Sequence, residues 1–228
     1  MKLLSWINEN SLQRALSSNP NAVQYLEQNP DKIDWYYLSE NPSAIHLLEA
    51  NMDKVIMQQV TKNPKGAHLI LDDPKLRERA TLTIGLNSNP GAVDFFMKNP
   101  EKIHWGLLAM NPAAMPILEP NLYKLDLYWV YLSTNPAAIH LLEQNPDKID
   151  WANLSRNPAA IHLLEQNPDK ISWSNLSLNP AAIHLLTTNL DKVSWYLLSS
   201  NPAAIHLLKQ NPDKIDWNYF SANPAIFE

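Results

Sequence analysis

The chain has 228 residues, 45% of them hydrophobic, and a formal net charge of −5. This composition is typical of a folded protein, and the mild negative charge argues against a nucleic-acid partner. It contains no cysteine, which excludes disulfides and thiolate metal sites. The sequence has no apolar run of the ~20 residues needed to cross a bilayer, so we expect no membrane partner.

Residues 1–18 are expected to form a degenerate N-terminal cap. Leu12, Leu16 and Ser17 match the end of the repeat described below, but Gln13 stands where that repeat has tryptophan. The apolar part of this segment is too short, and Glu9 follows it too soon, for a secretion signal.

From residue 19 onward one sequence motif is repeated. Its regular form is the 22-residue segment that begins at Asn135 with Asn-Pro-Ala-Ala-Ile-His-Leu-Leu. A fixed period of this length is typical of stacked repeat proteins. The sequence therefore predicts an all-α protein, an α-solenoid of about nine two-helix repeats that forms one domain over residues 19–228. The units at 63–88 and 111–134 are irregular, with four and two extra residues. The Asn-Pro pairs begin at Asn19, Asn41, Asn63, Asn89, Asn111, Asn135, Asn157, Asn179, Asn201 and Asn223.

Each unit is predicted to form two short helices. Asn135 suits the N-cap of the first helix, which would bury Ala138, Ile139, Leu141 and Leu142. The second helix would begin after Asp150, because this position holds a capping residue in several units: Asp34, Asp150, Ser172, Ser194 and Asp216. Such short helices are not stable alone, so each unit must pack on its neighbours.

A tryptophan recurs in the second helix and is predicted to form a structural spine along the stack: Trp35, Trp105, Trp129, Trp151, Trp173, Trp195 and Trp217. With layers ~8–10 Å apart, nine units would make a rod or arc about 75–90 Å long. The recurring Asp-Lys pairs cancel their own charge and are expected to form a solvated rim.

A histidine occupies one slot of the first helix and is predicted to face outward in register: His46, His68, His140, His162, His184 and His206. Neighbouring units would hold these imidazoles ~8–10 Å apart, too far for shared metal coordination at ~2 Å. The alternatives are a packing residue copied by duplication and a surface row whose charge rises near pH ~6.

Three positions of the repeat vary from unit to unit, whereas the tryptophan and core positions are largely constant. The variable positions are the two residues after each tryptophan and the residue before each Asn-Pro. A recognition surface on a constant scaffold has this pattern, and so does unconstrained surface. Tyrosine at several of these slots favours an interface. The candidate interaction residues are Tyr36, Tyr37, Glu40, Tyr131, Asn153, Arg156, Asn175, Tyr196 and Tyr219.

The segment from Asn135 to Ser155, in which Asn-Pro, Asp-Lys-Ile, Trp and Leu-Ser recur together, resembles the short repeats of proteins from giant DNA viruses of protists and algae. The resemblance weakens between Asn51 and Leu86. It implies a viral repeat protein located in the host cytoplasm or in the virion, and it implies no catalytic residues.

We therefore expect a non-enzymatic scaffold, without cofactor or metal, that binds a host or viral protein. The alternative is a structural virion component that self-associates end to end, because the chain stops at Glu228 within a first helix and leaves its last unit uncovered. A nucleic-acid-binding repeat is a third hypothesis, but it requires a basic stripe, and the only basic cluster (Lys75, Arg77 and Arg79) is interrupted by Glu78.

Overall fold

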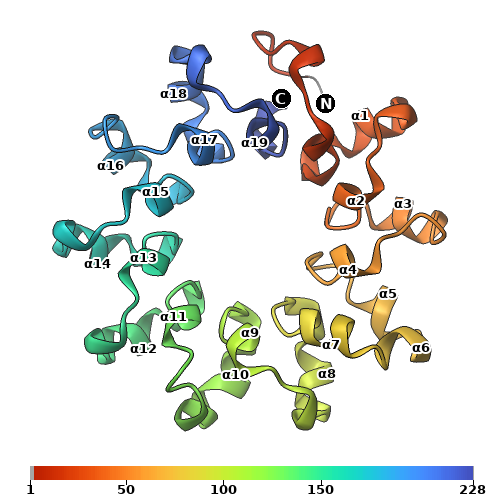
Figure 1. Cartoon of the computed structure of the whole chain (residues 1–228), viewed down its shortest axis with the longest axis vertical. Coiled ribbons are helices and arrows are strands. Elements are labelled where there is room, and N and C mark those ends of the chain that lie inside the picture. The colour runs from red at the N-terminus through yellow and green to blue at the C-terminus, as the bar shows by residue number, and fades with distance from the viewer. Residues whose placement is uncertain (1–2, 228) are drawn as a thin grey trace.

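A computed structural model describes residues 3–227 as two concentric layers of short helices that close into a toroid (Figure 1). Within these residues the backbone forms α-helices and 3₁₀ turns, together with one isolated β-bridge between Leu3 and Phe227. The predicted all-α repeat fold is confirmed.

In the regular form of the unit, the first half is a 3₁₀ turn that continues into an α-helix. In the unit that begins at Asn135, the turn is η9 (Pro136–Ala138) and the helix is α12 (Ile139–Gln144). The side-chain oxygen of Asn135 accepts a hydrogen bond from the backbone N–H of Ala137 at 3.0 Å. Asparagine is therefore the N-cap that the sequence predicts, although the first turn is 3₁₀ rather than α.

The second half is a 3₁₀ turn, η10 (Pro146–Lys148), followed by the one-turn helix α13 (Trp151–Leu154). Asp150 caps α13, because its carboxylate accepts a hydrogen bond from the N–H of Asn153 at 2.8 Å. The predicted start of the second helix is confirmed.

Serine in the Asp150 slot does not cap its helix through its side chain, contrary to the prediction for Ser172 and Ser194. The backbone N–H of Ser172 donates to the hydroxyl of Ser155 in the preceding unit at 3.0 Å, as that of Asp150 does to Ser133.

First-half helices form the outer layer and second-half helices the inner layer (Figure 1). The outer helices are α1 (Val23–Gln28), α3 (Ile45–Ala50), α5 (His68–Leu71), α6 (Pro74–Arg77), α8 (Val93–Lys98), α10 (Met115–Leu118), α12, α14 (Ile161–Gln166), α16 (Ile183–Thr187) and α18 (Ile205–Gln210). The inner helices are α2 (Trp35–Leu38), α4 (Met57–Val60), α7 (Ala80–Leu86), α9 (Trp105–Ala109), α11 (Trp129–Leu132), α13, α15 (Trp173–Leu176), α17 (Trp195–Leu198) and α19 (Trp217–Ser221).

The irregular units keep both layers. The extra residues of the 63–88 unit allow an additional helix, α6, which begins after the N-cap Asp73. In the 111–134 unit the turn before the inner helix is lengthened into η8 (Glu119–Lys124).

The core lies between the two layers. Ala138 and Leu142 of the outer half and Leu154 of the inner half are fully buried, and the same slots are buried in the other regular units. Leu141 is 5% exposed and Ile139 is half-buried, so the predicted apolar side of the first helix is confirmed.

The two ends of the array pack on each other, and the toroid closes between them. The backbone N–H of Leu4 donates to the carbonyl of Ile226 at 3.0 Å, and the Trp6 and Phe220 rings lie 5.7 Å apart. The turn η2 (Arg14–Ser18) contacts both α2 and α19. The expectation of an uncovered last unit is therefore wrong, because residues 3–18 pack between the first and last units.

Candidate functional site

The variable slots lie on the inner helices, on the side turned away from the core. In α13 and the residues after it, Leu154 and Ser155 are buried while Ala152 and Arg156 are exposed. Because the buried side packs against the outer layer, the exposed side faces the centre of the toroid (Figure 1). We call this surface the inner face.

Closure of the toroid places tyrosines from opposite ends of the sequence in one sector of the inner face. Tyr196 and Tyr219, on the neighbouring helices α17 and α19, have ring centroids 5.4 Å apart. Next along the inner layer comes η2, which carries the highly exposed Arg14, and then α2 with Tyr36. Tyr36 and Tyr196 are each 49% exposed. We call these residues, together with Tyr37, the joint sector.

Two ion pairs lie beside the joint sector, one on either side of α2. Arg14 lies 4.0 Å from the carboxylate of Asp34, and Lys62 lies 3.6 Å from that of Glu40. Both pairs are formed between neighbouring units and are solvent-accessible, so they shape the surface more than they stabilise it.

The remaining candidate residues lie on other parts of the inner layer. Asn153 and Arg156 belong to the α13 unit, and Asn175 lies in α15, where its amide donates to the carbonyl of Ala152 at 2.9 Å. Tyr131, in α11, lies over Gly106, where an added Cβ would approach its ring to 3.3 Å. The structure therefore does not bring these four residues into the joint sector.

The histidine ladder lies on the outer helices and is exposed, as predicted. Five of the six imidazoles contact a glutamate of the preceding unit through Nε2, for example His162 with Glu143 at 2.7 Å. The series ends at His206, because the corresponding position of the preceding unit holds Thr187. The ladder therefore links neighbouring units along the outside. The paired residues are His46–Glu27, His68–Glu49, His140–Glu119, His162–Glu143 and His184–Glu165.

The tryptophan spine fills the grooves between neighbouring units. Six of the seven indoles are capped by a lysine of the next unit, with Nζ 4.4 to 5.0 Å from the ring centroid, and in five of these pairs the lysine belongs to an Asp-Lys pair. The Asp-Lys row is therefore more than a solvated rim, because each of these lysines makes a cation–π contact between units. The pairs are Trp35–Lys54, Trp105–Lys124, Trp129–Lys148, Trp151–Lys170, Trp173–Lys192 and Trp195–Lys214.

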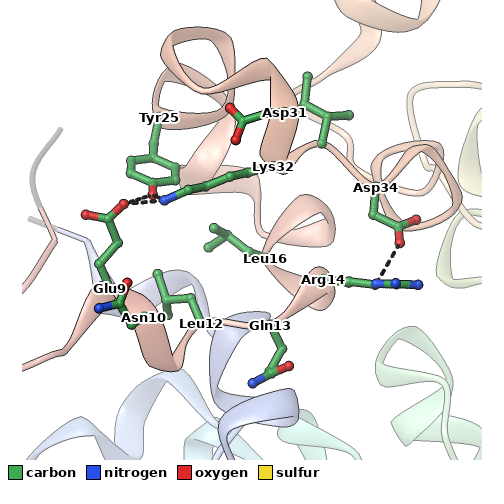
Figure 2. A pocket seen from close by; sticks show the side chains of 11 residues that line it. Glu9, Asn10, Leu12, Gln13, Arg14, Leu16, Tyr25, Asp31, Lys32 and Asp34 are labelled. Atoms are coloured by element: carbon green, nitrogen blue, oxygen red, sulfur yellow. Dashed lines mark hydrogen bonds and ion pairs between the residues drawn. The ribbon is translucent and has the colours of Figure 1, made fainter.

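Within residues 3–227 three grooves lack the tryptophan; one holds Met57 in its place, and a cavity opens at each of the other two. Gln13 stands in the tryptophan slot at the closure, where the cavity measures about 510 Å³ (Figure 2). Thr83 stands in the slot between the units that begin at Asn63 and Asn89, where the cavity measures about 380 Å³. A third hollow, about 260 Å³, lies beside Trp105 in the lengthened unit. We call the first of these the joint pocket.

A cluster of charged and aromatic groups closes one side of the joint pocket. Lys32 donates to the carboxylate of Glu9 and contacts the hydroxyl of Tyr25 (Figure 2). The hydrogen bond from Lys32, and then that from Tyr25, holds the pKa of Glu9 below its ordinary value. The same bond to Glu9 raises the pKa of Lys32, while burial is the main cause that raises the pKa of Tyr25.

The joint pocket was not among the predicted sites, although its signal is present in the sequence. In the sequence, Gln13 stands in the position of the repeat tryptophan. The cavity beside it forms only when residues 3–18 pack between both ends of the array. The position of Thr83 was hidden by the extra residues of its unit.

Among residues 3–227, no helix is long and apolar enough to span a membrane. The same residues contain no group of three or more histidine, aspartate or glutamate side chains placed to hold a metal ion.

Comparison with known proteins gave no match to a family model, to a curated protein or to a solved structure.

Proposed function

We propose that the toroid is a non-enzymatic scaffold that binds a protein partner on its inner face, with the joint sector at the centre of the contact. The observation that carries this proposal is the exposure of Tyr36, Tyr196 and Tyr219 beside Arg14 in one sector. Tyrosine and arginine are enriched at protein interfaces and among the residues that dominate binding energy. Because these residues lie on helices that are packed into the toroid, their backbone is already ordered, and this lowers the entropy cost of binding.

The partner that we propose is a host or viral protein, met in the host cytoplasm or in the virion. The support is the resemblance of the repeat phrase, from Asn135 to Ser155, to giant-virus repeat proteins. No cofactor or metal is part of the proposed role.

Self-association by end-to-end stacking is less well supported than partner binding. It was motivated by an uncovered last unit, and residues 3–18 now cover that unit through Leu4 and η2. Nucleic-acid binding is also less well supported, because Glu40 and Asp34 accompany Lys62 and Arg14 on the inner face.

Site-specific photo-cross-linking tests the proposal. A photoreactive phenylalanine analogue would replace Tyr196 on the inner face in one variant and His162 on the outer layer in a matched variant. We expect a discrete cross-linked protein from host-cell lysate with the Tyr196 variant only. Equal products from both positions, or none from Tyr196, would contradict an inner-face interface.

Affinity for the cross-linked partner then tests the individual residues. Changing Tyr36, Tyr196 and Tyr219 to alanine should weaken binding by about tenfold or more for each tyrosine at the centre of the contact. The matched control changes His140, His162 and His184 to alanine and should leave the affinity within about twofold of the wild type.

A further inference from the structure

We propose that the joint pocket binds one aromatic side chain supplied by the partner, in the place that a tryptophan of the chain itself occupies in other grooves. The inference rests on the proposed role as an interaction scaffold, because the partner supplies the aromatic ring. It adds a specific recognition element to the exposed tyrosines of the inner face.

The first argument is the equivalence of the lining. Asp31, Lys32 and Ile33 line the joint pocket, and they correspond in the repeat to Asp169, Lys170 and Ile171, which follow the Trp151 groove. In that groove Lys170 Nζ lies 4.4 Å from the indole centroid. The joint pocket therefore retains the side of the groove that receives an indole, and its lysine is paired with Glu9 in place of the indole.

The second argument is charge. Lys32 lies at the pocket, where its Nζ contacts the hydroxyl of Tyr25 and the carboxylate of Glu9. A cation at this position attracts the negative face of an aromatic ring. A partner's ring would thus meet the contact that Lys170 gives to Trp151.

The third argument is size and access. The joint pocket, about 510 Å³, falls within the range of ~300–1,000 Å³ that is usual for ligand pockets. Leu12, Leu16 and Ile33 give the pocket an apolar part among polar and charged residues, and Arg14 of the joint sector is one of its lining residues (Figure 2). A partner that contacts Arg14 would therefore lie next to the pocket.

The cavity at Thr83 has a similar arrangement, so the same kind of pocket forms at two places in the array. There Lys102 lies 3.4 Å from Glu78 and 5.7 Å from the Phe95 ring, and Phe95 occupies the slot that Tyr25 has in its unit. The Thr83 hydroxyl donates to the carbonyl of Arg77 at 2.8 Å. At both cavities, the lysine therefore turns to an aromatic residue of its own unit.

Ligand-observed NMR on the full chain tests the pocket with two probes, N-acetyl-tryptophanamide and its leucine counterpart. We expect saturation transfer to the tryptophan probe at millimolar concentration and at least about tenfold weaker binding of the leucine probe. The variant Gln13→Trp should fill the pocket and weaken the tryptophan probe by about tenfold. Because position 13 is exposed, this variant should keep the wild-type circular dichroism and melting behaviour.

A second variant, Gln13→Phe, guards against a folding failure of the first and should block the probe equally. Binding of both probes with equal affinity, or undiminished binding of the tryptophan probe to the folded Gln13 variants, would overturn the inference. Tight binding of free indole with exclusion of the blocked amino acid would also overturn it, because the ligand would then be a small molecule.

The cross-linked partner separates this inference from the proposed function. Loss of partner binding in both the tyrosine variant and Gln13→Trp supports the pocket as part of the interface. Loss in the tyrosine variant alone would reject the pocket's role and leave the proposed function standing.

Discussion

The side-chain amide of Asn19 donates a hydrogen bond to the backbone carbonyl of Asn223 at 2.7 Å, and this bond closes the toroid. The same amide reaches the carbonyl of Ser221 at 3.3 Å. All the remaining neighbouring pairs of Asn-Pro asparagines are joined by an equivalent pair of bonds. For example, the amide of Asn157 donates to the carbonyls of Asn135 and Ser133. The buried asparagines therefore form one circular ladder, and each also caps its own 3₁₀ turn.

The first prediction concerns one rung of this ladder. Asn157→Ala should lower the free energy of unfolding by about 2–4 kcal/mol, because it removes two buried hydrogen bonds and leaves two carbonyls without their donor. Asn157→Asp should lower the free energy of unfolding by at least as much. Its carboxylate can still accept the capping hydrogen bond, but it has no N–H to donate to the two carbonyls that it faces. Urea denaturation measures both changes.

The half-buried Asn153 provides the control, since it lies on the inner layer only four residues before Asn157, in the preceding unit. Asn153→Ala should change the free energy of unfolding by less than about 1 kcal/mol. Similar losses for Asn153→Ala and Asn157→Ala would contradict a special role of the ladder.

The second prediction follows from the closure. Because Leu3 and Phe227 are bridged, a short glycine-serine linker can join them, and new termini can be opened at the exposed turn between Pro146 and Asp147. Such termini interrupt neither the ladder nor the core, so the permuted chain should fold and melt within a few degrees of the wild type. Helical content and melting temperature by circular dichroism measure this.

An open array makes the opposite prediction. Linking its distant ends with a few residues would strain or unfold the permuted chain. A large loss of helical signal would therefore contradict the closed toroid.

The local structure of a unit could be predicted because it depends on residues near one another in the sequence. Asn135 and Asp150 are capping residues at helix starts, and the apolar pattern places Leu142 and Leu154 in the core. The closure could not be predicted in this way, because it depends on a rotation of about a tenth of a turn between units. That rotation is set by small differences in packing on the two layers.

The same limit applies to the candidate site. The sequence identifies Tyr36 and Tyr219 as variable-slot residues, but only closure makes their sectors adjacent through η2. It also assigns Asn157 to capping and misses its bonds to the previous unit, because those carbonyls lie 22 and 24 residues away in the chain.

The third prediction concerns the contact between Trp151 and Lys170. Trp151→Ala should lower the free energy of unfolding by about 3–5 kcal/mol, because it empties an inter-unit groove. Lys170→Met should lower it by only about 0.5–1 kcal/mol, the range of an exposed cation–π contact. A double-mutant cycle between the two positions measures their coupling.

In the background of Trp151→Ala the lysine substitution should lose most of its effect. An unchanged effect of Lys170→Met in both backgrounds would show that the lysine acts through another neighbour.

The fourth prediction concerns the pH dependence of the closure. The pKa of Glu9 lies below its ordinary value of 4.5 in the folded protein, because Lys32 and then Tyr25 donate to its carboxylate. A lowered pKa stabilises the fold above the ordinary value, and this stabilisation is lost as the pH falls through the folded-state pKa. The raised pKa of Lys32 stabilises the fold below its ordinary value of 10.5, and this stabilisation is lost as the pH rises through the folded-state value. Glu9→Gln should therefore melt below the wild type across the neutral range, and the two melting curves should converge as the pH falls through the folded-state pKa of Glu9.

Asp147→Asn, in an exposed turn of a regular unit, serves as the control and should follow the wild type at neutral pH. A difference between Glu9→Gln and the wild type that persists undiminished in acid would show that the glutamine disturbs packing at the joint rather than the ionised contact with Lys32.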